Sequence, residues 1–313
     1  MKRVLVTGAS GFIGRQCLPL LLAKGYEVHA LSRRQLSSIA LPNVIWHEAD
    51  LLTPGCATEL LSEVRAEYLL HLAWYAVPGK FWEARENIEW VQASLAVLCA
   101  FADNGGKRMV AAGSCAEYNC SAGECQEDTT LLLPTSLYGA SKHALEVILR
   151  SSSRQTRLSS AWGRIFFLYG PHEHPSRLVA YVVRSLLRGE PALCSDGRQI
   201  LDFMHVEDAA SAFVALLESA VEGPVNIGSG NPIAIRDVLQ EIGQQLGRLE
   251  LIRFGARSSM AESNRFWANT ERLANEVNWL PHYDLTRGIK QTIEWWRDSM
   301  RVSPEFLCGS AGK

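Results

Sequence analysis

A glycine-rich turn between an apolar strand and a leucine-rich helix constrains this chain more than any other feature. Residues 3–7 predict a short buried strand, and Gly-Ala-Ser-Gly-Phe-Ile-Gly follows directly at residues 8–14. Gly8 permits a tight turn, Gly11 lets a ligand's pyrophosphate approach the backbone, and Gly14 lets the helix pack on the strand. The amides of the first helical turn would then hold phosphate groups. The stretch therefore predicts a dinucleotide-binding strand–turn–helix unit.

The overall composition excludes several classes of protein. The chain has 313 residues, of which 47% are hydrophobic and 20% charged, enough for a buried α/β domain with a smaller lobe. The formal net charge of -2 gives no reason to expect nucleic acid or an anionic membrane as a partner. No apolar run reaches the length of a membrane span, and no signal peptide precedes the first strand. We expect a cytoplasmic protein.

The eight cysteines predict free thiols rather than a disulfide framework. Cys115, Cys120 and Cys125 are evenly spaced, which raises the alternative of a metal site. Because a C-x-x-C pair and a nearby histidine are both missing, we predict no metal.

Strand and helix patterns alternate along most of the chain. This alternation predicts a Rossmann-type, doubly wound parallel sheet of the α/β class. Further strands are expected at residues 26–31, 44–49, 68–73, 108–113, 158–168 and 225–228, and helices at residues 81–103, from 138 onward and at 285–297.

The end of the second predicted strand bears on the choice of cofactor. A site that prefers NAD places an acid there to bind the ribose 2′-hydroxyl, but this chain reads Ser32-Arg33-Arg34. Guanidinium groups suit a 2′-phosphate because they present a fixed fork of donors. We therefore favour NADP(H) over NAD(H). The alternative is that both arginines lie on a solvated loop.

Three residues predict proton-transfer chemistry. Ser114 ends the fifth strand, while Tyr138 and Lys142 are spaced i and i+4 on one face of a helix. A lysine ammonium close to a phenol favours the phenolate and lowers its pKa. Ser114 would bind the substrate's oxygen, and Tyr138 would give or take its proton. The alternative for such a Tyr–Lys pair is an ordinary surface pair.

These motifs together resemble the extended branch of the short-chain dehydrogenase/reductase superfamily, the NAD-dependent epimerases and dehydratases of nucleotide sugars. The resemblance rests on Thr-Gly-Ala-Ser-Gly-Phe-Ile-Gly and Tyr-Gly-Ala-Ser-Lys and covers nearly the whole chain. It implies a catalytic triad of Ser114, Tyr138 and Lys142, with Asn87 as support on the substrate side. It also implies a set of cofactor-binding residues: Gly8, Ser10, Gly11, Phe12, Ile13, Gly14, Arg33, Arg34, Asp50, Leu51, Leu72, Ala73, Tyr138 and Lys142.

The chain departs from this branch on the substrate side. Phe167 and Leu201 stand where the family's epimerases carry an asparagine and an arginine near the substrate diphosphate. Arg257 matches the later phosphate-binding arginine, and Arg198 could replace the missing one. Residues 111–118 and 137–143 look most like the subgroup of nucleotide-sugar 4-ketoreductases that includes CDP-abequose synthase.

These features predict the organisation and function of the chain. We expect a dinucleotide-binding domain from residues 1–170 and 201–228, and a substrate lobe from residues 171–200 and 229–313. The expected activity is NADPH-dependent reduction of the 4-keto group of a nucleotide-linked 6-deoxyhexose, in a homodimer. An NAD-dependent 4-epimerase is the alternative, and a non-catalytic dinucleotide sensor is a third interpretation. The sugar and the base are not specified by the sequence.

Overall fold

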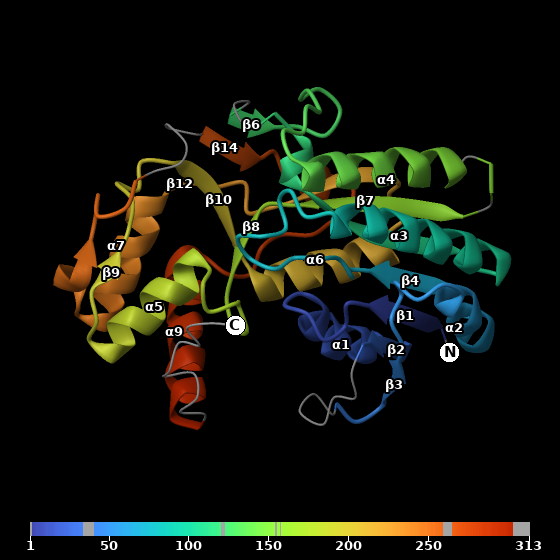
Figure 1. Cartoon of the computed structure of the whole chain (residues 1–313), viewed down its shortest axis with the longest axis horizontal. Helices are drawn as coiled ribbons and strands as arrows, with labels where there is room; N and C mark the ends of the chain where they lie inside the picture. Colours follow the sequence, from blue (N-terminus) through green and yellow to red (C-terminus); the bar gives the residue numbers. More distant parts are fainter. Residues whose placement is uncertain are drawn as a thin grey trace.

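A seven-stranded parallel sheet forms the larger part of the molecule. The computed structural model describes residues 2–33, 41–119, 123–153, 155–156, 158–258 and 265–302. The sheet has the strand order β11-β7-β5-β4-β1-β2-β3 (Figure 1), and this confirms the predicted Rossmann-type fold. Its strands are β1 (Arg3–Thr7), β2 (Glu27–Ser32), β3 (Val44–Glu48), β4 (Tyr68–His71), β5 (Arg108–Ser114), β7 (Ser159–Ile165) and β11 (Gly223–Ile227).

Strand β1 lies inside this sheet, between β4 and β2, because it is apolar on both faces. Val4, Leu5 and Val6 are all buried, as expected for a parallel strand covered by helices on both sides. In the register of the sheet Thr7 lies beside His71 of β4. The carboxyl ends of β1 and β4 thus meet at one edge, where ligands bind in folds of this kind.

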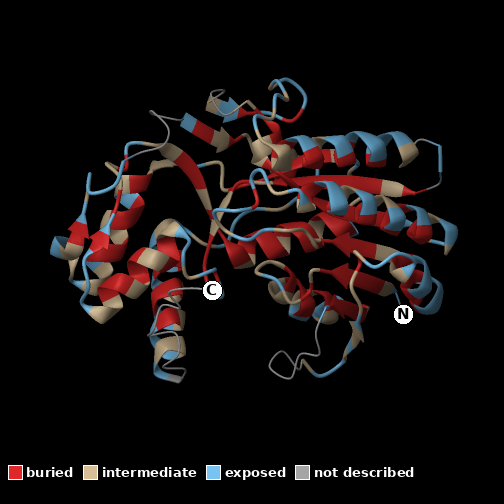
Figure 2. Cartoon of the chain, in the orientation of Figure 1, coloured by how far each residue is buried: buried red, intermediate tan, exposed pale blue. Residues whose placement is uncertain are grey.

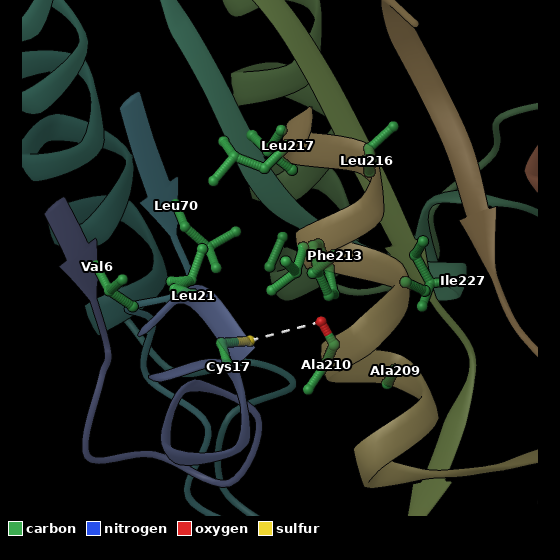
Figure 3. Close-up of a cluster of buried hydrophobic side chains, with 14 of the residues drawn as sticks. Val6, Cys17, Leu21, Leu70, Ala209, Ala210, Phe213, Leu216, Leu217 and Ile227 are labelled. Atoms are coloured by element: carbon green, nitrogen blue, oxygen red, sulfur yellow. Dashed lines mark hydrogen bonds between the residues drawn. The ribbon is translucent and has the colours of Figure 1, made fainter. Parts of the chain in front are cut away.

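Two layers of helices cover the sheet. On one face, α1 (Gly14–Ala23) packs on α6 (Val206–Glu218), where Cys17 donates a hydrogen bond to the Ala210 carbonyl over 3.8 Å and Phe213 is fully buried (Figure 3). The other face is covered by α2 (Cys56–Val64), α3 (Glu86–Asp103) and α4 (Leu137–Ser153). Figure 2 shows the strands mainly buried and the outer faces of α3 and α4 exposed.

A second unit with its own core lies at the other end of the molecule (Figure 1). Its sheet has the order β12-β10-β14-β6, with β8 paired to β10, and a separate ribbon pairs β13 with β9. Val182, Ile242 and Trp296 are buried where its main helices meet. Its strands are β6 (Gly123–Cys125), β8 (Phe167–Tyr169), β9 (Ala192–Leu193), β10 (Ile200–His205), β12 (Pro232–Ala234), β13 (Ile252–Arg253) and β14 (Arg265–Ala268). Its helices are α5 (Leu178–Arg188), α7 (Ile235–Leu246) and α9 (Leu285–Val302), and the short α8 (Glu271–Asn275) packs near β11.

Three boundaries differ from those predicted. The strand expected at residues 158–168 is divided at Phe166, so that β7 stays in the large sheet and β8 pairs with β10 of the lobe. The helix expected from Phe81 begins at Glu86, because residues 77–85 form turns. Strand β10 was expected within the dinucleotide domain, but it hydrogen-bonds to lobe strands on both sides, while α6 and β11 return to the large sheet.

Other features of the described residues bear on the sequence predictions. Cys17, Cys56, Cys99, Cys115, Cys125 and Cys194 take part in no disulfide among the described residues, and Cys120 and Cys308 lie outside those residues. Within the described part of the chain, no three histidine, cysteine or acidic side chains gather as a metal site. None of its helices is both long and apolar enough to cross a membrane.

Candidate active site

The glycine turn after β1 is packed as the dinucleotide prediction requires. Gly8 has a φ of +67°, and a Cβ placed there would lie 2.7 Å from the Ala73 amide nitrogen. A Cβ at Gly14 would lie 2.2 Å from the Gly8 carbonyl oxygen. Both contacts are with backbone, so no side chain could move aside. The turn, the start of α1 and the end of β4 therefore approach as closely as glycine permits.

The turn that leads into α1 has amides that, among the described residues, are free to bind an anion. No side chain caps this helix, and its first turn contains no acidic residue. Among the described residues, the amides of Phe12 and Ile13 donate to no acceptor. The guanidinium of Arg15 donates to the carbonyls of Ser10 at 2.9 Å and Gly11 at 3.3 Å, and so holds the turn in place. This arrangement fits the pyrophosphate of a dinucleotide.

The remaining predicted cofactor residues that the structure describes lie at the same edge of the sheet. The Leu72 amide donates to the Thr7 carbonyl at 3.2 Å, and the Ala73 amide donates to the Thr7 hydroxyl at 3.3 Å. Asp50 accepts from the Leu52 amide at 3.0 Å, and Leu51 is buried. Arg33 is exposed just after β2, and Arg34 lies outside the described residues.

His71 is a structural residue of this edge. One ring nitrogen bonds the Thr7 hydroxyl at 2.8 Å and the other bonds the Ser94 hydroxyl at 2.9 Å. Burial, followed by the charge of Lys142, lowers the pKa of His71 to about 3. The imidazole is therefore neutral at physiological pH, with both nitrogens engaged.

Ser114 is positioned by a buried carboxylate that the sequence analysis did not identify. Glu117 accepts from the Ser114 amide at 2.8 Å, from Trp162 Nε1 at 2.9 Å and from Arg164 Nε at 2.9 Å. The Ser114 side chain accepts from the Ala116 amide at 3.2 Å, which fixes the short 3₁₀ turn after β5. Glu117 is thus a structural residue, and only its position beside Ser114 could have suggested this.

Tyr138 is enclosed by aromatic side chains from the segment between β4 and α3. Its ring meets the rings of Phe81, Trp82 and Trp74 edge to face, with centroids 4.8, 5.9 and 6.5 Å away. Its amide donates to the Trp82 carbonyl at 2.9 Å. Burial raises the pKa of Tyr138 to about 12, while a hydrogen bond with Ser114 acts in the opposite direction.

Lys142 lies beside Tyr138 on α4 but is engaged elsewhere. Its ammonium donates to the Ala112 carbonyl at 2.8 Å and lies 3.6 Å from the centroid of the Trp74 ring. Burial lowers the pKa of Lys142 to about 7. The prediction that this ammonium brings the pKa of Tyr138 below its ordinary value is wrong for this structure, because the effect of burial on the phenol is larger.

Asn87 is a supporting residue rather than a free polar group. Its amide nitrogen donates to the carbonyls of Phe81 at 2.7 Å and Ala84 at 2.8 Å, and its oxygen accepts from Trp74 Nε1 at 2.9 Å. A buried amide with these partners is not available for direct contact with a substrate. The residue instead holds Trp74 against the site.

The two arginines expected at the substrate lie in the lobe. Arg198 is exposed, with its Nε 3.3 Å from Asp196. Arg257 is exposed too, and its guanidinium carbon lies 5.0 Å from the centroid of the Tyr181 ring. A third lobe arginine, Arg177, was not predicted, and it lies over Phe81.

The comparisons with known proteins agree with this geometry. Residues 4–228 match the NAD dependent epimerase/dehydratase family. The chain belongs to this family. It is therefore an NAD(P)-dependent oxidoreductase of the extended short-chain dehydrogenase/reductase type, which confirms the identification made from the sequence.

Relatives match the chain along nearly its whole length. UDP-glucuronate 4-epimerase of Thermodesulfobacterium geofontis (strain OPF15) is 24% identical, over 96% of this chain and 98% of its own. MoeE5 in complex with UDP-glucuronic acid and NAD is 28% identical with a TM-score of 0.82, over 95% of this chain and 99% of its own. UDP-glucose 4-epimerase of Thermotoga maritima has a TM-score of 0.85 at 23% identity, over 95% and 99% of the two chains, and shows the same fold.

Proposed function

We propose that the protein uses NADPH to reduce the 4-keto group of a nucleotide-linked 6-deoxyhexose. The observation that carries this proposal is the meeting of Ser114, Tyr138 and Lys142 at the sheet edge that also bears the glycine turn. A hydroxyl, a phenol and an amine beside a phosphate-binding turn suit proton transfer to a carbonyl next to a nicotinamide.

Each side chain has a distinct task in this reaction. Tyr138 donates its proton to the oxygen at C4, and its raised pKa keeps the phenol protonated for that role. Ser114, anchored through Glu117, donates a hydrogen bond to the same oxygen. Lys142 is held at the Ala112 carbonyl, from which it could bind the nicotinamide ribose. The dinucleotide, when bound, supplies the hydride.

Arg33 supports NADPH as the reductant. It lies exposed directly after β2, where dinucleotide-binding folds hold the adenosine ribose. The described end of β2 contains no acid that could bind a ribose 2′-hydroxyl. An arginine in this place suits a 2′-phosphate.

The names of the relatives favour a second candidate, a nucleotide-sugar 4-epimerase. MoeE5 is described with NAD and UDP-glucuronic acid, and two further relatives are 4-epimerases. An epimerase would use the same three side chains but keep its cofactor through each turnover. The two candidates therefore differ in the fate of the nicotinamide.

The test is to follow the absorbance of NADPH or NADH with CDP-, dTDP-, GDP- and UDP-linked 4-keto-6-deoxyhexoses. Stoichiometric oxidation of NADPH by one of these sugars supports the reductase. If none is reduced and denaturing the protein releases bound NAD, the reductase is wrong, and the panel is repeated with UDP-glucose and UDP-glucuronic acid.

We further propose a homodimer formed through α3 and α4. These helices pack together, and each leaves apolar side chains exposed: Ile88 on α3, and Val147 and Ile148 on α4. Sedimentation of the protein should give the mass of two chains, and Ile148→Glu should shift it toward one. A single-chain mass for the unaltered protein at micromolar concentration would contradict the dimer.

A further inference from the structure

The ammonium of Lys142 lies against the face of an indole ring. Its Nζ is 3.6 Å from the centroid of the Trp74 ring, while the centroid of the Trp162 ring is farther away, at 5.9 Å. A cation over an aromatic face is attracted by the electron density of the ring, most strongly where the ring is a tryptophan and water is excluded. Lys142 is only 4% exposed, so both conditions hold here.

Trp74 is held in this position from its other side. Its Nε1 donates to the side-chain oxygen of Asn87 at 2.9 Å, and the Asn87 amide nitrogen is fixed in turn by two backbone carbonyls. The ring also packs near Trp90 of α3, with the two centroids 6.4 Å apart. The segment after β4 therefore presents a fixed indole face to the lysine of α4, and this face cannot turn away without breaking the bond to Asn87.

The contacts of the ammonium leave one N–H unused. A lysine ammonium has three donors. One of them binds the Ala112 carbonyl at 2.8 Å, and a second direction is covered by the Trp74 ring. Among the described residues, the ammonium of Lys142 meets no further acceptor. The remaining N–H is therefore available to a ligand, and the other two contacts fix its direction.

Other titratable groups surround Lys142. Burial lowers the pKa of its amine, and the charge of Glu117, from the turn after β5, raises it. Glu117 is itself paired with Arg164 of β7 at 2.9 Å, so its charge is shared. His71 of β4 is neutral, and on α4 the phenol of Tyr138 is protonated at neutral pH. The indole face is thus a direct contact that favours the ammonium over the neutral amine.

We propose that Trp74 is a positioning residue whose ring face keeps the Lys142 ammonium charged and directs its remaining N–H to the nicotinamide ribose. The proposal rests on the proposed task of Lys142 at that ribose. It adds that the segment after β4, fixed to α3 through Asn87, determines how much of the lysine is a cation at neutral pH. Burial takes the pKa of Lys142 to about 7, so a large share of the amine would be neutral there without a contact that favours the charge.

The experiment compares Trp74→Phe with Trp74→Leu. Both variants lose the indole N–H and its bond to Asn87, but only Trp74→Phe keeps an aromatic face on the ammonium. The readout is a carbon-13 NMR titration of protein labelled at the lysine ε-carbon, with the Lys142 signal assigned by its loss in Lys142→Met. The Lys142 midpoint should lie about one pH unit lower in Trp74→Leu than in Trp74→Phe. Trp267→Leu, which removes a half-buried tryptophan of the lobe, is the control and should keep the unaltered midpoint.

A second measurement weakens the ring face with little change in its shape. Fluorine withdraws electron density from an indole ring and so reduces its attraction for a cation. Labelling with 5-fluorotryptophan should therefore lower the Lys142 midpoint in the unaltered protein. In Trp74→Phe the same labelling changes only the more distant rings, so the midpoint should stay nearly unchanged.

Turnover tests the functional part of the proposal. With the ammonium as the active form, kcat/KM falls as the pH rises through the pKa of Lys142, and this fall should follow the NMR midpoint in both Trp74 variants. Three outcomes overturn the proposal: equal midpoints in Trp74→Phe and Trp74→Leu, a fluorinated protein that titrates like the unlabelled one, or a fall in kcat/KM that does not follow the midpoint. If no sugar of the panel is reduced but the midpoints differ as expected, the proposed function fails and the contact between ring and ammonium stands.

Discussion

Tyr138 combines a reactive phenol with an enclosed site, and this combination makes its role testable. The rings of Phe81 and Trp82 enclose it without contributing polar groups of their own to the phenol. Tyr138→Phe keeps the ring and its packing and removes only the hydroxyl. We expect turnover to fall by about a hundredfold or more, because general acid catalysis is lost. Dinucleotide affinity, measured by calorimetry, should change less than threefold or so, since the phosphate-binding turn is untouched. A variant with full turnover would remove Tyr138 from the mechanism.

Lys142 should destabilise the folded protein, because its amine is buried. Burial lowers its pKa from 10.5 to about 7, so between these values the unfolded chain binds a proton that the folded chain does not. The free energy of unfolding therefore increases as the pH rises from about 7 to 10.5. Below pH 7 Lys142 is charged in both states, and its burial destabilises the fold by the full amount. Lys142→Met should stabilise the protein by about 2 kcal/mol at pH 6.5, with a smaller gain at pH 9.5.

Urea unfolding at both pH values checks this expectation, and Lys290→Met is the control because Lys290 is exposed on α9. An equal gain at pH 6.5 and pH 9.5 would show that packing, rather than the charge, is responsible. The same Lys142→Met variant should lose turnover, which would show that the buried amine is kept for function.

The sequence could predict those site residues whose type and spacing place them at the same edge of the sheet. Ser114 ends a strand, and Tyr138 and Lys142 follow on one helical face, so their meeting follows from the topology. Glu117 and Arg177 could not be predicted in this way. The first is an acid that happens to be buried beside Trp162 and Arg164, and the second comes from a distant lobe.

At the scale of elements, the fit between β1, the glycine turn and α1 depends on the absence of a single methyl group. A Cβ at Gly14 would lie 2.2 Å from the Gly8 carbonyl oxygen, and backbone cannot yield as a side chain can. Gly14→Ala should therefore displace the turn and weaken dinucleotide binding about tenfold or more, a cost of at least 1.4 kcal/mol or so. Calorimetric titration measures the affinity. Gly25→Asn, at an open position with a φ of +78° that asparagine tolerates, should bind like the unaltered protein.

The boundaries of an element were predictable where the local sequence pattern determines them. They were not predictable where contacts with other elements determine them. Strand β5 follows its apolar run and is buried throughout. The run at residues 158–168 also looks continuous, but its second half leaves the large sheet, because Phe203 and Met204 of β10 pair with Phe167 and Leu168. Likewise, residues 81–85 carry helix-forming types, yet Phe81 and Trp82 are used to cover Tyr138.

At the scale of the whole molecule, the phosphate-binding turn touches the substrate lobe directly. Arg15 follows the turn and donates to Nδ1 of His172 at 2.6 Å, while the His172 ring packs on Trp295 of α9 with centroids 4.5 Å apart. Burial, followed by the charge of Arg15, lowers the pKa of His172 to about 4. The ring is therefore neutral and able to accept the bond at physiological pH. Since Arg15 also holds the carbonyls of Ser10 and Gly11, one side chain links the turn to the lobe.

This link should couple the two binding events proposed for the protein. His172 has a φ of +68°, so His172→Gly removes the ring without backbone strain, and His172→Asn keeps an acceptor in a conformation that asparagine tolerates. We expect NADP⁺ to strengthen binding of the nucleotide sugar that the panel identifies, and His172→Gly to reduce that coupling about fivefold. Because coupling is reciprocal, four calorimetric titrations per variant measure it twice: each ligand alone and each in the presence of the other. His172→Asn should retain most of it. Equal coupling in the unaltered protein and in His172→Gly would mean that the turn and the lobe act independently.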